Sequence, residues 1–374
     1  MANDFNSVIP QILAQGLMAL RENAVTAQLV NRGYSPESGT QGSTVDVPVP
    51  SAVVANAVSP SNTPPTAKDS SPTTVPVVVD QWYEAPFHLT DRDMAEAMTG
   101  IIPMQASEAI KSLINIVDLS VLGEYKNFYG AYGTAGTTPF GSGVDLKSAT
   151  QIRKILNKQL APLTDRRVVF DPDAEAAALE LRAFNDGSYS GDFMAIREGQ
   201  LNRKLGFEWW MNQNTPTHTA GTAASMLVNG TPAVGATTLN QDGGTGTLVL
   251  GDLFTIAGDP QYYVVTAENS NVTTTPGITF APGLQAAPAD NAAITVVGTH
   301  VVNLAFHRDA IAFASRPLQQ LTLPGSIIRE ATDPVSRLTL RLEVTRQHKQ
   351  TVFSYDMLWG TKTVRPALGA RLLG

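Results

Sequence analysis

The side chains that most often carry out chemistry are few and scattered in this sequence. It contains no cysteine, which excludes disulfides, thiol nucleophiles and thiolate metal sites. A metal site would need several of the histidines to converge, and no His-Glu-x-x-His pair brings two of them together. The five histidines stand singly at His88, His218, His300, His307 and His348. The residue types therefore predict no metal site.

Three short patterns resemble parts of active sites, and each has a simpler explanation. The Gly-rich segment 242–248 (DGGTGTL) is not followed by a helical pattern, so it predicts a hairpin turn and not a phosphate loop. The Gly-Ser-Gly at 141–143 lacks the strand–elbow–helix frame of a serine hydrolase. Asp171 and Asp173 flank Pro172, as residues at a helix start do. We predict no catalytic residue, no cofactor and no enzymatic activity.

Composition favours a role in assembly. A chain of 374 residues with 43% hydrophobic residues can bury a large core and suggests about two or three domains. Charged residues make up only 16%, below the roughly 25% of an average soluble protein. No apolar run approaches the ~20 residues that span a bilayer, and the N-terminus lacks the basic start of a signal peptide. We therefore expect a cytoplasmic origin and no membrane partner.

Charge is unevenly distributed along the chain. Residues 223–297 contain five acidic residues and no Lys or Arg, whereas residues 298–374 are basic. The acidic block consists of short apolar runs separated by Gly, Pro, Asn and Asp, which is typical of a small all-β barrel or sandwich. We predict that it is a β-domain inserted into an α/β domain, away from nucleic acid.

The segments before this block alternate in type. Residues 5–30 have helical spacing and either pack on their own domain or form an arm on a partner. Residues 45–50 and 75–89 read as the two strands of a long flap, with a Pro/Ser/Thr-rich tip at 59–74. Pro103 begins a helix to about Gly130, roughly 40 Å long, which would serve as a spine. Residues 145–162 and 172–184 read as helices around a buried strand at 166–172.

Residues 195–221 raise a separate expectation. They read as a charged helix, then a strand after Gly206, then the start of the insert. Trp209 and Trp210 are adjacent on that strand, so they should face opposite sides. After the insert, residues 300–318 read as a strand followed by a helix, and the C-terminal segment reads as two or three strands. Arg341 and the other arginines of this basic part are expected to pair with carboxylates at subunit interfaces.

These segments, in this order, resemble the major capsid proteins of tailed bacteriophages, and in particular the podovirus coat proteins with an inserted β-domain. The resemblance is carried by REGQLNRKLGFEWWMNQNTPTHTAGT (197–222), GDLFTIAG (251–258), NLAFHRDAIAFASRPL (303–318) and YDMLWGTKTVRPALGARL (355–372). The N-terminal part matches by layout only. The resemblance covers roughly residues 90–374.

The resemblance implies an α+β, Hong Kong 97-type capsid fold with an inserted all-β barrel. The implied parts are an N-terminal arm (1–44), an extended β-hairpin loop (45–90), a peripheral domain with the spine helix (91–144, completed by C-terminal strands), the first part of an axial domain (145–222), the inserted β-domain (223–297) and the return through axial and peripheral domains (298–374). It implies hexameric and pentameric capsomers of an icosahedral head, assembled in the host cytoplasm.

The partners that the resemblance implies are further copies of the chain, scaffolding and portal proteins, a decoration protein, and packaged double-stranded DNA contacted non-specifically. Two other functions stay open from the residues. One is an encapsulin-type protein shell of the same fold, against which the large insert argues. The other is a surface β-rich binding protein, against which the α/β remainder argues.

Overall fold

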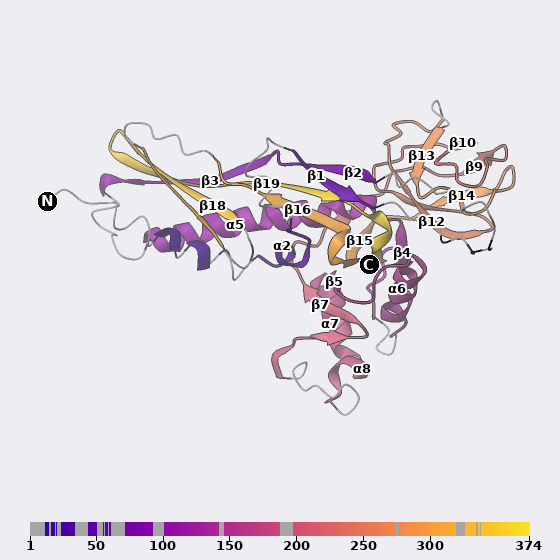
Figure 1. Cartoon of the computed structure of the whole chain (residues 1–374), viewed down its shortest axis with the longest axis horizontal. Coiled ribbons are helices and arrows are strands. Elements are labelled where there is room, and N and C mark those ends of the chain that lie inside the picture. The colour runs from indigo at the N-terminus through magenta and orange to yellow at the C-terminus, as the bar shows by residue number, and fades with distance from the viewer. Residues whose placement is uncertain are drawn as a thin grey trace.

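The computed structural model describes residues 12–14, 16–18, 20, 24–33, 44–50, 55, 57–58, 60, 72–92, 101–141, 146–187, 197–273, 277–318, 326–333, 336 and 338–374. The protein is a mixed α and β structure built along one long body (Figure 1). A β-barrel lies at one end of this body, and a smaller unit of helices and strands projects from its side. No helix of the described segments is long and apolar enough to cross a membrane.

The body consists of the helix α5 (Ile101–Gly123) packed on an antiparallel sheet. The apolar positions of α5 recur every three or four residues, and Ile110, Leu113 and Val117 are fully buried against the sheet. The helix ends in a 3-10 turn, η1 (Glu124–Asn127), slightly earlier than the predicted end near Gly130. The sheet contains β3 (Gln81–Thr90), β16 (Ile311–Ser315), β17 (Ser326–Thr332), β18 (Thr339–Gln347) and β19 (Gln350–Thr363).

The predicted flap is only partly a hairpin. β1 (Thr44–Val49) pairs with β2 (Thr73–Val78), but the chain then breaks at Val79–Asp80 and continues as β3, which pairs with β19 in the body. The prediction of one return strand over 75–89 is therefore wrong. Valines at the base of the hairpin are buried against Ala312, Ala314 and Leu358 of the same chain, so this base has an intramolecular partner. The tip at 59–74 lies mostly outside the described residues.

The described part of residues 5–30 also packs on its own chain. The short helix α2 (Thr26–Leu29) and the residues before it bury Leu20, Ala27 and Leu29 in the main core. Asp118 of α5 accepts hydrogen bonds from the backbone N–H and hydroxyl of Thr26 and from Asn212 Nδ2 at 2.7 Å. Of the two alternatives for this segment, the structure favours packing on its own domain.

The projecting unit is built on a seven-stranded sheet. Its strands are β4 (Gly130–Gly133), β5 (Arg166–Phe170), β6 (Arg203–Lys204), β7 (Phe207–Met211), β8 (Thr217–His218), β15 (His300–His307) and β20 (Gly369–Leu373). Its helices are α6 (Lys147–Lys158), α7 (Pro172–Glu180) and α8 (Arg182–Asn185). The predicted strand at 166–172 and the helices on either side of it are confirmed.

The acidic block folds as a closed barrel of six strands with its own apolar core. The strands are β9 (Met226–Asn229), β10 (Thr238–Asp242), β11 (Leu253–Ile256), β12 (Asp259–Val265), β13 (Gly277–Ala281) and β14 (Ala293–Val296). A second, small apolar cluster, in which Leu253 and Val264 meet Ala131 and Leu373, joins the barrel to β4 and β20. The barrel therefore packs directly on the edge of the seven-stranded sheet.

One predicted helix ends earlier than expected and another is wrong. Arg197–Glu198 are helical, but Gly199–Leu205 are not, because Arg203–Lys204 turn back at Leu205–Gly206 to pair with β7 as a tight hairpin. After β15, a single 3-10 turn, η2 (Arg308–Ala310), leads into the strand β16 where a helix was expected. The Ile-Ala-Phe-Ala sequence of β16 is compatible with either structure, and its pairing with β19 decides for the strand. The C-terminal segment forms three strands, since η3 (Pro366–Leu368) separates β19 from β20.

Candidate functional site

Two of the five histidines do come together, although the sequence contains no metal-binding motif. The rings of His218 and His300 lie 5.3 Å apart at the point where the chain enters and leaves the barrel. His88 and His348 are exposed, on β3 and in the turn after β18 at the same end of the five-stranded sheet, and His307 lies at the end of β15. Within the segments that the structure describes, no three His, Cys, Asp or Glu side chains are arranged to hold a metal ion.

The two histidines belong to a buried polar cluster, which we call the junction network: Tyr125, His218, Asp252, His300 and Arg371. His218 Nε2 lies 2.8 Å from Asp252 Oδ1, and His218 Nδ1 lies 2.9 Å from the Tyr125 hydroxyl. Because a carboxylate only accepts, His218 donates from Nε2, and in the neutral ring Nδ1 accepts from Tyr125. The hydrogen bonds form a chain from η1 through β8 to the barrel.

Asp252 is held at the barrel end by the backbone as well. The N–H of Val249 donates to Oδ2 at 2.7 Å, and the N–H of Gly221 donates to both carboxylate oxygens at 3.2 Å. A Cβ at Gly221 would lie 2.2 Å from the carbonyl oxygen of Thr247 and 2.8 Å from Asp252 Oδ2. The close approach of backbone and carboxylate therefore requires glycine at this position.

Arg371 supplies the positive charge of the junction network from β20. Its guanidinium is completely buried, donates from Nη1 to the carbonyl oxygen of Gly251 at 2.7 Å, and stacks on the Tyr125 ring at 4.9 Å. Burial lowers the pKa of Arg371 to about 9, while Tyr125 and Asp252 act in the opposite direction. At neutral pH the arginine stays charged and balances the Asp252 carboxylate inside the protein.

His300 is uncharged at neutral pH. Burial, with Arg371 and His218 nearby, lowers the pKa of His300 to about 4, against the effects of the Gly298 carbonyl and Asp252. Its Nδ1 lies 2.8 Å from the Gly298 carbonyl oxygen and donates to it. All five side chains are removed from solvent or nearly so, so the cluster has no access for a substrate. The arrangement can fix the position of the barrel, and it is not built for turnover.

The sequence contains a signal for this cluster that no residue-type motif describes. His218 and His300 stand just outside the two ends of the acidic block. The ends of an inserted domain must lie close together for the host domain to continue. The segments that enter and leave the barrel do lie side by side, since the N–H of Ala220 donates to Thr299 Oγ1 at 3.1 Å. Polar residues just outside the two ends of an insert are therefore candidates for contact with each other.

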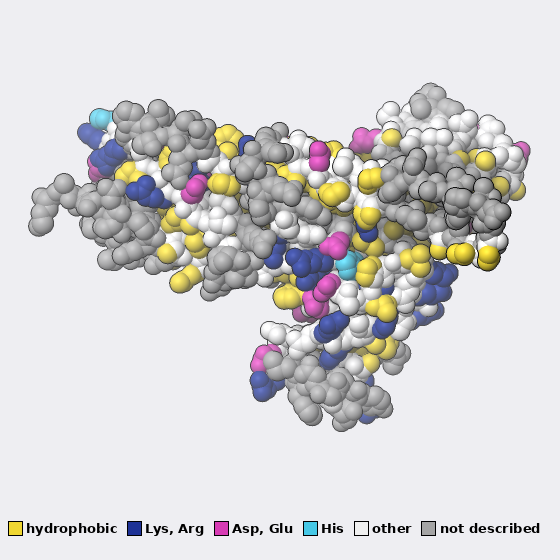
Figure 2. Space-filling view, viewed as in Figure 1, with side chains coloured by type: hydrophobic (Ala, Val, Ile, Leu, Met, Phe, Trp, Pro, Cys, Tyr) yellow, Lys and Arg dark blue, Asp and Glu magenta, His cyan; other side chains and the backbone are white. Residues whose placement is uncertain are grey.

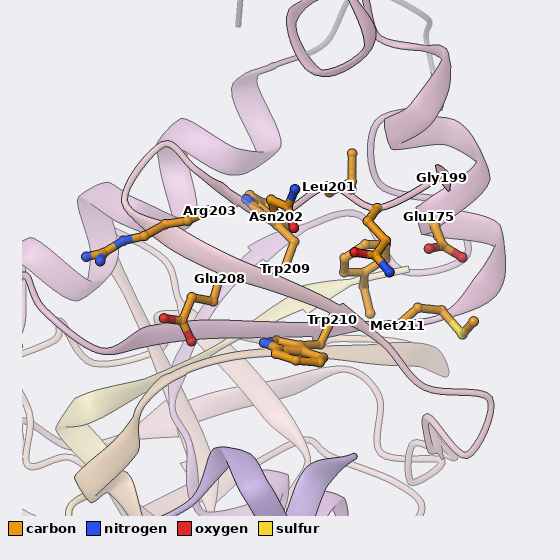
Figure 3. A pocket seen from close by; sticks show the side chains of 11 residues that line it. Glu175, Gly199, Leu201, Asn202, Arg203, Glu208, Trp209, Trp210 and Met211 are labelled. Carbon is orange, nitrogen blue, oxygen red and sulfur yellow. The ribbon is translucent and has the colours of Figure 1, made fainter. Parts of the chain in front are cut away.

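Trp209 and Trp210 face opposite sides of β7, as predicted. Trp209 is 6% exposed and its ring packs edge-on against four phenylalanines, with ring centroids 5.4 to 6.0 Å apart. Trp210 is 42% exposed. Figure 3 shows the two side chains leaving β7 in opposite directions. Trp209 therefore belongs to the core of the projecting unit, and Trp210 belongs to its surface.

An open pocket of about 380 Å³ adjoins these residues. It is lined by Trp210, Met211, segment 199–203, Glu175 and Glu208 (Figure 3). Glu208 pairs with Arg167 at 3.1 Å, and burial raises the pKa of Glu175. Among the described residues that line this pocket there is no histidine or hydroxyl side chain to share a proton with either carboxylate. An apolar floor with charged walls suits a contact pocket for a protein side chain better than a catalytic site.

The arginine pairing expected at interfaces is found within the chain. Arg341 Nε and Nη2 both donate to the carboxylate of Asp356 across β18 and β19, at 2.5 to 3.1 Å. Arg346 pairs with Asp91 at 2.6 Å. Cross-strand register places Arg341 opposite Asp356. Both ion pairs lie within one chain, so the prediction of intersubunit pairing is wrong for these two arginines. Asp171 lies at the N-cap position of α7, with Asp173 in the first turn, as predicted. The Gly-Ser-Gly motif lies partly outside the described residues.

No protein-family model and no curated protein sequence matches the chain. The fold is similar to a chain of Mycobacterium phage Che8, with a TM-score of 0.53 and 15% identity over 93% of this chain and 90% of that one. Weaker alignments are found with the capsid structure of cyanophage P-SCSP1u (TM-score 0.48, 11% identity, 89% and 84% covered) and a virus-like particle from Pyrococcus furiosus (0.47, 8%, 97% and 98%).

At this level of identity the likeness to the Che8 chain concerns the fold. It extends over nearly the full length of both chains. The chain thus shares its fold with a phage chain, and the expected mixed α and β class is confirmed.

Proposed function

We propose that this chain is the major capsid protein of a tailed bacteriophage, which assembles into hexamers and pentamers of an icosahedral head around double-stranded DNA. The observation that carries the proposal is the shared fold with a phage chain over 93% of this chain and 90% of that chain. Because the match extends over nearly the full length of both chains, we infer that the two share a whole subunit architecture and not only one domain.

The parts of a capsid subunit are assigned on this basis. The long body with α5 corresponds to the peripheral domain, and the projecting unit with α6 and α7 to the axial domain. The six-stranded barrel corresponds to the inserted domain, residues 223–297, and the hairpin β1–β2 to the base of the extended loop. Residues 1–44 remain the N-terminal arm of this scheme. These assignments follow the Hong Kong 97-type layout, because the segments of this chain follow one another in a similar order.

The role is binding and not chemistry. A shell needs surfaces that meet in head-to-tail arrangement around an axis, and this chain offers a pocket with an exposed Trp210 and a set of exposed apolar side chains, including Trp82 and Leu160. The polar clusters in its interior hold the subunit in shape. Scaffolding, portal and decoration proteins would be its other partners, and packaged DNA would be contacted without base recognition.

Electron microscopy of the purified full chain tests the proposal. We expect capsomers or closed shells of uniform size in negative stain, formed by the chain alone or with a co-expressed scaffolding protein. A chain that stays monomeric at every concentration and with every candidate scaffold would contradict it.

The contents of such shells separate the proposal from an encapsulin-type compartment, with which the fold is also compatible. A phage head protects double-stranded DNA from added nuclease when it is isolated from infected cells. A compartment shell instead encloses a protein, which mass spectrometry of the washed particles would identify.

A further inference from the structure

The exposed face of α6 is strongly basic. The helix contains Lys147, Arg153, Lys154 and Lys158 and no acidic residue. Lys147, Lys154 and Lys158 are spaced by seven and four residues, so they lie on one face, and all three are exposed. Arg153 is used inside the subunit, since its Nη1 donates to the Leu205 carbonyl oxygen at 2.8 Å. Among the described residues no acidic side chain forms an ion pair with Lys154 or Lys158.

This face forms one wall of a groove of about 530 Å³ between α6 and the barrel. Lys154 and Lys158 line the α6 side, Tyr132 of β4 lines the floor, and Pro260 and Tyr262 of β12 line the barrel side. Figure 2 shows dark blue side chains gathered where α6 lies beneath the barrel, next to a row of hydrophobic side chains. The groove thus combines a basic helix face with an apolar edge.

The barrel of the same chain has the complementary charge. It has no Lys or Arg, and its exposed carboxylates are Asp242, Glu268 and Asp290 on separate turns and strand ends. Asp259 faces the groove, but it is half-buried and accepts hydrogen bonds from the Tyr263 hydroxyl at 2.5 Å and the Gln261 N–H at 2.9 Å. The solvent-exposed negative charge of the barrel is therefore on its outer turns and not in its own groove.

We propose that in the assembled shell the basic face of α6 on one copy binds an acidic turn of the barrel on a neighbouring copy, with the groove receiving that turn. The inference rests on the proposed function, because it needs a second copy beside the first. One chain presents two different, oppositely charged surfaces, which is what a head-to-tail contact requires. Opposite charges steer such a contact and fix its register.

A nucleic acid is the less suitable occupant of the groove. A duplex has one negative charge per about 1.7 Å of its axis, so it would extend beyond three lysines and meet the acidic barrel that forms the other wall. A single turn of a neighbouring barrel presents one or two carboxylates on a compact surface, which fits a groove of this size.

Charge reversal with rescue tests the contact. The variant Lys154→Glu/Lys158→Glu should fold normally, because both side chains are exposed, but its yield of closed shells should fall by about tenfold or more through like-charge repulsion. A second reversal in the same chain, Asp242→Lys, Glu268→Lys or Asp290→Lys, should restore the yield for the acidic residue that meets α6. Lys154→Arg/Lys158→Arg, which keeps the charge, should assemble like the wild type, as should Lys111→Glu on α5.

Each outcome decides the inference. Normal shells from the double reversal would overturn it, and so would a defect that none of the three barrel reversals rescues. Normal shells that have lost DNA would assign the lysines to the nucleic acid and equally overturn it. If the wild type itself forms no shells or capsomers, the proposed function fails. If the wild type forms shells and the double reversal forms them equally well, only the proposed contact of α6 fails.

Discussion

Trp209 and Trp210 are neighbours in the chain with opposite surroundings, and they allow folding and assembly to be tested separately. Trp209→Ala should destabilise the subunit by about 3–5 kcal/mol, because it leaves a cavity among four phenylalanine rings. Chemical denaturation of the purified chain measures this loss. Trp210→Ala is the matched control and should change stability by no more than about 0.5 kcal/mol. Equal losses in the two variants would contradict the burial described for β7.

His300 makes the stability of the subunit depend on pH. Its pKa is lowered in the folded chain to about 4 from 6.5, so the unfolded chain binds the proton more tightly. The stabilising contribution is therefore present above pH 6.5 and is lost as the pH falls from 6.5 to about 4. At 1.36 kcal/mol per pH unit, the loss is on the order of 3 kcal/mol.

The variant His300→Gln isolates this effect, because its amide can still donate to the Gly298 carbonyl but does not titrate in this range. Denaturation curves of the wild type and the variant, recorded from pH 7 to pH 4, should converge as the pH falls. Asp118, whose pKa burial raises, acts in the opposite direction in both proteins and cancels in the comparison. Parallel curves for the two proteins would show that His300 is not the titrating group.

The alternation of the two tryptophans was predictable from the sequence, because the direction of a side chain on a strand depends only on local geometry. The junction network was not. Tyr125, His218, Asp252, His300 and Arg371 come from five segments that no periodicity relates, and only the topology of the seven-stranded sheet and the barrel brings them together. No residue-type motif describes such a cluster.

At the scale of elements, long amphipathic patterns were the reliable part of the sequence. α5 was predictable because its buried face repeats over six turns. The strand β16 was predicted as a helix because five residues of Ile, Ala, Phe and Ser fit both patterns, and the deciding hydrogen bonds come from β19, about fifty residues later. The break between β2 and β3 was missed because the alternation of side chains continues through Val79–Asp80.

The barrel should fold without the rest of the chain, since its apolar core is separate from that of the body. A fragment of residues 222–298 is expected to give a dispersed, β-type amide spectrum by NMR and a cooperative melt. It should nevertheless be marginal, because removal from the subunit exposes Leu253 and Val264 and leaves Asp252 without His218. A random-coil spectrum would mean that the barrel forms only on the body, and the predicted boundary at 223–297 would be wrong.

At the scale of the whole molecule, the hairpin β1–β2 separates the stability of the subunit from its assembly. Its base is buried on its own chain through Val45, Val47 and Val77, so shortening it beyond that base should leave the fold intact. Replacing residues 50–72 by Asn-Gly gives a two-residue connection that suits antiparallel strands, here between Val49 and Thr73. We expect an unchanged melting temperature and a reduced yield of shells.

The same variant can contradict the assigned role of the loop. Shells formed at the wild-type yield and of the wild-type size would show that residues 50–72 make no contact that assembly needs. A lower melting temperature would instead show that the segment stabilises the subunit itself, and it would then have to be described as part of the body.

The burial of Arg371 has a consequence for how this chain can change over evolutionary time. The arginine belongs to β20 of the projecting unit, but its hydrogen-bond acceptor is the carbonyl of Gly251 and its counter-charge is Asp252, both supplied by the barrel. A deletion that removed the barrel cleanly, joining Gly221 to Gly298, would leave Arg371 as an unpaired cation on β20 of the seven-stranded sheet. Loss of the barrel is therefore expected to require a second change, such as Arg371→Leu, so one buried residue outside the barrel makes this domain difficult to discard.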